Sequence, residues 1–171
     1  MKKHYYSWQD IETMCTSVVK QICRDSWMPD YIVGINRGGL IPGVILSHML
    51  GVPCRSLNVS LRDNKGSSES DLEMAADAFG VNHDRKLKNI LIVDDINDSG
   101  ATLSWIKKDW EKVINNHNGV WHNNVRFATL TNNSFSQFKD VDYSGHNISK
   151  IEEFGYSLWY VFPWESVGDY E

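Results

Sequence analysis

Short apolar runs rich in β-branched residues recur along this 171-residue chain, at residues 31–35, 90–93 and 125–130. Runs of this length and composition are typical of strands that are covered on both faces. Residues 54–59 alternate between apolar and polar side chains and predict a further strand.

Between these strands, apolar residues recur at the spacing of a helix. Ser7 and Asp10 resemble a capping box at the start of the first such pattern. The predicted helices span about 8–25, 41–50, 72–79 and 101–115. The alternation of strands and helices predicts an α/β fold with a parallel sheet and right-handed crossovers.

Composition narrows the class of protein. The net charge is −5 with no basic tract, which argues against a nucleic-acid surface. No apolar run approaches the roughly 20 residues that cross a bilayer, and the first residues lack the apolar core of a secretion signal. We therefore expect a cytoplasmic protein that binds neither nucleic acid nor membrane. Cys15, Cys23 and Cys54 form no C-x-x-C pair and are predicted to be buried free thiols.

Residues 89–103 carry the most specific chemical pattern of the chain. Asp94 and Asp95 directly follow the apolar run, at the carboxyl end of a strand, where open α/β sheets bind their ligands. Residues 98–102, Asp-Ser-Gly-Ala-Thr, then lead into a helix, whose first N–H groups and dipole suit a phosphate. The two carboxylates would repel a phosphate unless they bind something else. Sugar hydroxyls and Mg²⁺ are suitable ligands for them.

An ordinary strand-to-helix turn is the alternative explanation of this segment. Asp98 or Ser99 would then only cap the helix. A capping role does not account for the adjacent pair Asp94 and Asp95, so the pattern favours a phosphorylated sugar with a metal.

The same segment resembles the phosphoribosyl pyrophosphate (PRPP) motif of type I phosphoribosyltransferases, and the chain is most similar to their purine members of the xanthine–guanine and hypoxanthine type. The resemblance implies a Rossmann-like core with helices on both faces and a small C-terminal hood. It implies Mg²⁺ as cofactor, with Asp95 as the metal ligand. The PRPP-binding residues that it implies are Arg37, Gly38, Asp94, Asp95, Ile96, Asn97, Asp98, Ser99, Gly100, Ala101 and Thr102.

A second glycine-rich turn lies at residues 36–39, Asn-Arg-Gly-Gly, before the helical pattern at 41–50. Glycines let the backbone approach a ligand closely, and Arg37 can bind a phosphate with two hydrogen bonds. The turn resembles the pyrophosphate-binding loop of purine phosphoribosyltransferases, with Asn36 where the bacterial xanthine–guanine enzymes have serine. The alternative is a plain glycine turn with a surface arginine.

The tail is rich in aromatic residues. Residues 159–165, Trp-Tyr-Val-Phe-Pro-Trp-Glu, resemble the hood segment that carries the base platform in xanthine–guanine enzymes, which implies base contacts for Trp159 and Tyr160. Packing in the core or at a dimer contact is the alternative. Asn133 stands at about the position where related purine enzymes place a base-reading lysine, so we expect its amide to contact the base edge.

The resemblance also implies a reaction, the transfer of phosphoribosyl from PRPP to a nucleobase with release of pyrophosphate. Asp94, Asp95 and Asp98 are the expected catalytic residues, with Asp98 taking a proton from the base. In a loop at about 60–87, Arg62 and Lys65 either cover pyrophosphate or are solvated surface charges.

We expect one domain over residues 1–171, with a core at about 1–150 and a hood at about 151–171. A purine (guanine, xanthine or hypoxanthine) is the favoured base, while Asn133 keeps a pyrimidine or atypical base open. A PRPP-sensing regulator of the same fold is the alternative function. The resemblance implies a homodimer or homotetramer.

Overall fold

The computed structural model describes residues 2–59, 61, 71–113, 119–149 and 158–165. Their helices and strands, in chain order, are β1 (Lys2–Tyr5), α1 (Trp8–Arg24), β2 (Tyr31–Asn36), α2 (Leu40–Leu50), β3 (Cys54–Asn58), α3 (Leu72–Phe79), β4 (Ile90–Asn97), α4 (Ala101–Trp110), the 3-10 helix η1 (Glu111–Val113), β5 (Val125–Asn133), β6 (Tyr143–Ile148) and β7 (Leu158–Val161).

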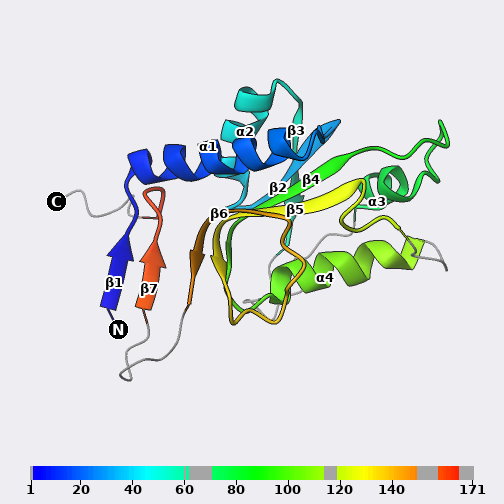
Figure 1. Ribbon diagram of the computed structural model, residues 1–171. Helices are drawn as coiled ribbons and strands as arrows, with labels where there is room; N and C mark the ends of the chain where they lie inside the picture. The colour runs from blue at the N-terminus through cyan, green and yellow to red at the C-terminus, as the bar shows by residue number, and fades with distance from the viewer. Residues whose placement is uncertain (1, 60, 62–70, 114–118, 150–157, 166–171) are drawn as a thin grey trace.

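A five-stranded parallel sheet forms the centre of the molecule, in the order β3-β2-β4-β5-β6. Helices α1 and α2 cover one face of this sheet, and α3 and α4 lie on the other (Figure 1). The predicted α/β class with helices on both faces is therefore confirmed.

The central strand β4 is buried on both faces, as its continuous apolar sequence predicted. Ile90 and Ile92 pack into the apolar cluster on the α3 and α4 side of the sheet. Leu91 and Val93, which point the opposite way, pack into the cluster on the α1 and α2 side. All four side chains are at most 1% exposed, so the first half of β4 is packed on both sides.

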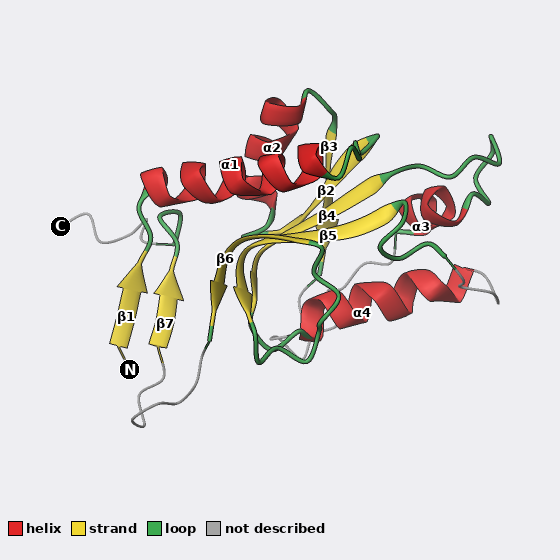
Figure 2. Cartoon of the chain, viewed as in Figure 1, coloured by secondary structure: helices red, strands yellow, loops and turns green. Residues whose placement is uncertain are grey.

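Strands β1 and β7 form a separate two-stranded parallel sheet that joins the two ends of the chain. Figure 2 shows this pair standing beside the β6 edge of the main sheet. Neither β1 nor β6 was predicted, since Lys2–Tyr5 is exposed throughout and Tyr143–Ile148 has a mixed pattern. The helix predicted over 101–115 ends as an α-helix at Trp110 and continues as η1.

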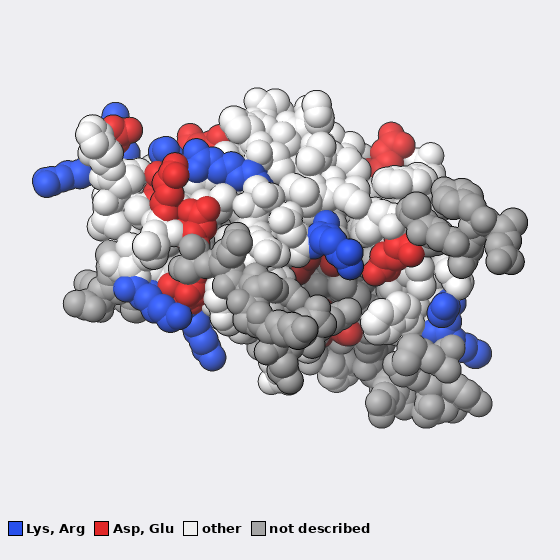
Figure 3. Space-filling model, turned by 180° about the vertical axis from the view of Figure 1, so that it is seen from behind, with Lys and Arg blue, Asp and Glu red and all other residues white. Residues whose placement is uncertain are grey.

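Charged side chains of both signs are mixed on the surface (Figure 3). In Figure 3 the Lys and Arg side chains are spread over the visible face in small groups, interspersed with acidic ones. Cys15, Cys23 and Cys54 are free thiols, as predicted, but only Cys15 is buried, while Cys54 is half-buried and Cys23 is exposed. The prediction of burial was wrong for Cys23 because this residue lies off the buried face of α1. Among the described helices, none is both long and apolar enough to cross a membrane.

Candidate active site

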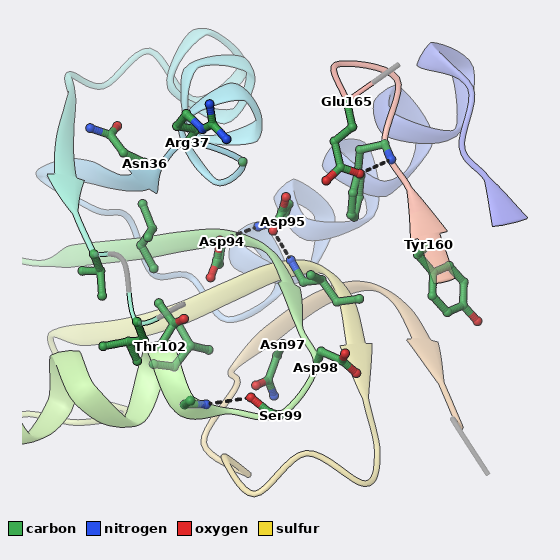
Figure 4. Close-up of a pocket in the computed structure, with 18 of the residues that line it drawn as sticks. Asn36, Arg37, Asp94, Asp95, Asn97, Asp98, Ser99, Thr102, Tyr160 and Glu165 are labelled. Carbon is green, nitrogen blue, oxygen red and sulfur yellow. Dashed lines mark hydrogen bonds between the residues drawn. The ribbon is translucent and has the colours of Figure 1, made fainter. Parts of the chain in front are cut away.

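A cavity of about 890 Å³ opens at the carboxyl ends of β2 and β4, and residues of β7 line it too. Figure 4 shows its polar side chains converging from the turn after β2, from the end of β4 and from the segment after β7. The described residues that line it are Ile35, Asn36, Arg37, Gly38, Ile41, Val59, Leu61, residues 94–103, Trp159, Tyr160, Phe162, Trp164 and Glu165.

Every residue predicted to bind PRPP lines this one cavity. Trp159 and Tyr160, predicted from the tail, line it too. The three segments that the sequence singled out separately therefore meet around a single space. Arg62 and Lys65 lie outside the described residues, so their role stays a prediction.

Asp94 and Asp95 lie side by side on the floor of the cavity (Figure 4). Asp94 Oδ1 accepts a hydrogen bond of 3.0 Å from the backbone N–H of Asp95, and Asp95 Oδ1 accepts one of 2.8 Å from that of Ile96. Burial, and then the nearby Glu165 carboxylate, raise the pKa of Asp95 to about 6. A site that disfavours the negative charge of its own carboxylate is suited to receive a cation.

Carboxylate oxygens, a ligand type that Mg²⁺ prefers, lie close together at this point. Asp95 and Glu165 are acidic groups that repel each other across the cavity, and a divalent cation would relieve that repulsion. In the described part of the chain, no cluster of three or more acidic, histidine or cysteine side chains could hold a metal. Mg²⁺ commonly keeps water and substrate oxygens among its ligands and needs only one or two carboxylates, so the residues fit this ion.

The turn that begins at Arg37 and Gly38 lies directly against the two aspartates at the edge of the cavity. The Asn36–Arg37 peptide bond is cis. A Cβ atom on Gly39 would lie 2.4 Å from the carbonyl oxygen of Val93. The absence of a side chain at this position therefore lets the turn pack directly on the end of β4.

The turn of residues 98–102 leads from β4 into α4. Gly100 has φ +88°, a left-handed conformation that favours glycine, and caps α4 without a side-chain hydrogen bond. The backbone N–H of Gln137 donates to the carbonyl oxygen of Ser99 at 3.0 Å. The start of α4 thus opens toward the cavity while the turn is supported from behind.

Asn97 also supports this turn, with a side chain that is 1% exposed. Its amide nitrogen donates to Asn132 Oδ1 at 2.9 Å and to the carbonyl oxygen of Phe138 at 3.0 Å. Its amide oxygen accepts a hydrogen bond of 2.8 Å from Ser136 Oγ. These contacts hold the turn of residues 98–102 against Asn132 in β5 and against the segment that follows β5.

The aromatic wall of the cavity is anchored by a residue that sequence reasoning missed. Tyr160 stacks on Tyr6, with ring centroids 5.6 Å apart. The hydroxyl of Tyr6 accepts a hydrogen bond of 3.1 Å from Thr131 Oγ1 in β5 and lies 3.1 Å from His146 Nδ1 in β6. Tyr6 thereby ties the β1–β7 pair to the main sheet, a role that no local pattern in the sequence signals.

Asn133 is the one predicted site residue that does not line the cavity. Its side chain is 7% exposed, and its amide nitrogen donates to the Asp98 carboxylate at 3.2 Å. The prediction that Asn133 contacts the base edge is not tested by this arrangement and stays a prediction.

The comparisons with known proteins agree with this geometry. Residues 1–163 match the phosphoribosyl transferase domain family. Xanthine phosphoribosyltransferase 1 of Saccharomyces cerevisiae is 28% identical over 130 residues, 66% of this chain and 62% of the yeast protein. Adenine phosphoribosyltransferase of Nostoc punctiforme is 35% identical over 99 residues, 54% of this chain and 57% of that protein. The matched stretch thus spans less than two thirds of either relative.

Among solved structures, that of a purine phosphoribosyltransferase from Pyrococcus horikoshii is similar to this chain with a TM-score of 0.67 and 26% identity. The similarity covers 100% of this chain and 99% of that one. The family match includes the main sheet, both glycine-bearing turns and the strand that carries Trp159 and Tyr160. The chain therefore belongs to the phosphoribosyl transferase domain family.

Proposed function

We propose that this protein transfers the 5-phosphoribosyl group of PRPP to a nucleobase, giving a nucleoside monophosphate and pyrophosphate. The observation that carries the proposal is the single cavity, which brings together a phosphate-binding turn, two aspartates, an arginine turn and an aromatic wall. Each of these suits one part of the reactants.

The phosphate turn, residues 99–102, suits the 5-phosphate. Its backbone N–H groups lie at the start of α4, where the helix dipole favours an anion. Asp94 and Asp95 would hold the ribose hydroxyls. Arg37 and the amides around Gly38 would bind the pyrophosphate, because a guanidinium pairs with phosphate oxygens through two hydrogen bonds.

Asp98 is the proposed proton acceptor, since it lines the cavity between the phosphate turn and the aromatic wall. Loss of pyrophosphate from the anomeric carbon develops positive charge on the ribosyl ring, as in glycosidic chemistry. The carboxylates of Asp94 and Asp95 would favour that charge. Asp98 would take the proton from the ring nitrogen of the base as the new bond forms.

Mg²⁺ is proposed to bind at Asp95, and Asp94 and Glu165 are further carboxylates in the same cavity. When bound, the ion would neutralise charge on the departing pyrophosphate.

For the base, we propose a purine held against Trp159 or Tyr160. Flat rings are bound by aromatic faces with a few polar groups at their edges. The relatives include proteins named for xanthine and for adenine. The proposal therefore names purines as a class and not one particular purine. A cytoplasmic homodimer or homotetramer, as the resemblance implies, belongs to the same proposal.

The test is release of pyrophosphate from PRPP and Mg²⁺ with guanine, xanthine, hypoxanthine, adenine, uracil and orotate offered separately. We expect turnover with one or two purines, and its loss in Arg37→Ala. Arg55→Ala is the matched control, because Arg55 lies outside the cavity and its partner Glu73 is exposed. PRPP binding by calorimetry without turnover on any base would overturn the transferase in favour of a PRPP-sensing regulator.

A further inference from the structure

The contact between Asn133 and Asp98 follows from the pairing of β4 with β5. These parallel strands place Asn97 opposite Asn132. Asp98 and Asn133 are the next residues after this pair, and they are therefore neighbours at the carboxyl end of the sheet. Asn133 Nδ2 lies 3.2 Å from Asp98 Oδ1 and 3.3 Å from the Asp98 carbonyl oxygen.

The orientation of the Asn133 amide is determined by its other end. Asn133 Oδ1 accepts a hydrogen bond of 3.1 Å from the backbone N–H of Phe135. A flipped amide would bring its NH₂ group against that N–H and its oxygen against the Asp98 carboxylate, so both contacts would become repulsive. The NH₂ group therefore faces Asp98.

We propose that Asn133 is a positioning residue that holds the Asp98 carboxylate in place for proton transfer from the base. This inference rests on the proposed function. Asn133 is buried behind Asp98 and does not line the cavity, so it acts through Asp98. A donor to the ionised carboxylate restrains Asp98 without taking its negative charge away.

Asn124 offers a matched control at the opposite end of the same strand, directly before β5. It is 5% exposed, and its amide nitrogen also donates twice, to the carbonyl oxygens of Ala78 at 2.8 Å and Lys88 at 2.9 Å. Replacing Asn124 by leucine removes two hydrogen bonds donated by its amide. Replacing Asn133 removes two donated by its amide and one that it accepts from the Phe135 N–H. Only the change at position 133 removes hydrogen bonds beside the proposed proton acceptor.

The experiment compares Asn133→Leu with Asn124→Leu, each alone and with Asp98→Asn, in steady-state kinetics on the best base and on PRPP. We expect Asn133→Leu to lower kcat about 10- to 100-fold, the effect of a misplaced reacting group, with KM for PRPP nearly unchanged. In the Asp98→Asn background the same change should lower kcat less than about 2-fold, because the group it positions is gone. Asn124→Leu should leave kcat per folded molecule unchanged.

Other results would overturn the inference. A kcat for Asn133→Leu equal to that of Asn124→Leu would do so, and so would full additivity with Asp98→Asn. A change of base preference in Asn133→Lys at unchanged kcat would assign Asn133 to the base edge. Asn133→Ala replaces Asn133→Leu if the larger side chain prevents folding. No turnover by the wild-type chain would instead overturn the proposed function, and this role of Asn133 with it.

Discussion

Gly38 lies directly against the Asp95 carboxylate, so that a Cβ atom on Gly38 would stand 1.9 Å from Asp95 Oδ2 and 2.5 Å from Asp95 Cγ. This contact joins the turn after β2 to the end of β4, the two segments that the sequence marks most strongly. The turn reaches the aspartates only because position 38 has no side chain.

Replacing Gly38 by alanine should therefore destabilise the free protein. The added methyl group must displace the carboxylate or the turn, and overpacking of this kind costs about 1–3 kcal/mol. Urea unfolding of Gly38→Ala measures the loss. Combined with Asp95→Ala, which makes room, Gly38→Ala should cost markedly less. Equal losses in both backgrounds would show that the contact with Asp95 is not the cause.

A second prediction concerns the charge of Asp95. Its pKa is raised from 3.8 to about 6 by burial and by Glu165, so the folded chain binds this proton more tightly than the unfolded chain. The contribution of Asp95 to stability is then most favourable below pH 4 and declines as the pH rises toward 6. At pH 7, Asp95→Asn should therefore have a free energy of unfolding higher than that of wild type, by on the order of 1 kcal/mol, as measured by urea unfolding. This difference should disappear below pH 4.

These unfolding curves are measured in metal-free buffer, since a bound cation would offset the repulsion from Glu165. Asp10 provides a control of opposite sign, because its hydrogen bonds with Ser7 lower its pKa. Asp10→Asn should therefore destabilise the protein at pH 7, with the difference fading as the pH falls through the range where Asp10 is protonated. A destabilised Asp95→Asn at pH 7 would contradict the prediction.

The parts of the fold that the sequence predicted are those with local causes. The apolar run at Ile90–Val93 predicted a buried strand because each residue must face one of two covered sides. The turn at Gly100 was predictable because a helix pattern follows a small-residue segment. Both rest on short-range rules of periodicity and turn chemistry.

The parts that were missed depend on contacts between distant residues. Lys2–Tyr5 carries no strand pattern and becomes β1 only by pairing with Leu158–Val161. The partner of Asn133 follows from the register of β4 and β5, which the sequence of neither strand specifies. The predicted correspondence of Asn133 with the lysine of related enzymes therefore said nothing about where its amide points.

Tyr6 is the clearest of these long-range contacts, and its hydroxyl can be tested alone. Tyr6→Phe keeps the stacking on Tyr160 but removes the acceptor for Thr131, which is 0% exposed. We expect a loss of about 1 kcal/mol in the free energy of unfolding. Hydrogen exchange of the β1 and β7 amides should accelerate more than that of β4, because the hydroxyl ties the small sheet to the large one.

Tyr5→Phe is the control for this change, since Tyr5 is 61% exposed and adjacent in the chain. It should leave both stability and exchange unchanged. Uniform acceleration across both sheets in Tyr6→Phe would mean that the hydroxyl supports the whole fold and not the attachment of β1 and β7.

The last prediction separates Trp159 from Tyr160 as the platform for the base. Both residues line the cavity, but neighbouring residues of a strand face opposite ways. The Tyr160 ring stacks on Tyr6, and Trp159 is 39% exposed. Stacking of a base on an aromatic ring is worth about 1–3 kcal/mol. Trp159→Ala should therefore raise KM for the base about 10-fold, with KM for PRPP nearly unchanged.

Phe135→Ala is the matched control for Trp159→Ala, because Phe135 is 55% exposed and does not line the cavity. Loss of this exposed ring should leave KM for both substrates unchanged. An equal rise of KM for PRPP and for the base in Trp159→Ala would indicate that the indole shapes the cavity as a whole. An unchanged KM for the base would transfer the platform to Tyr160, whose ring is already held by Tyr6.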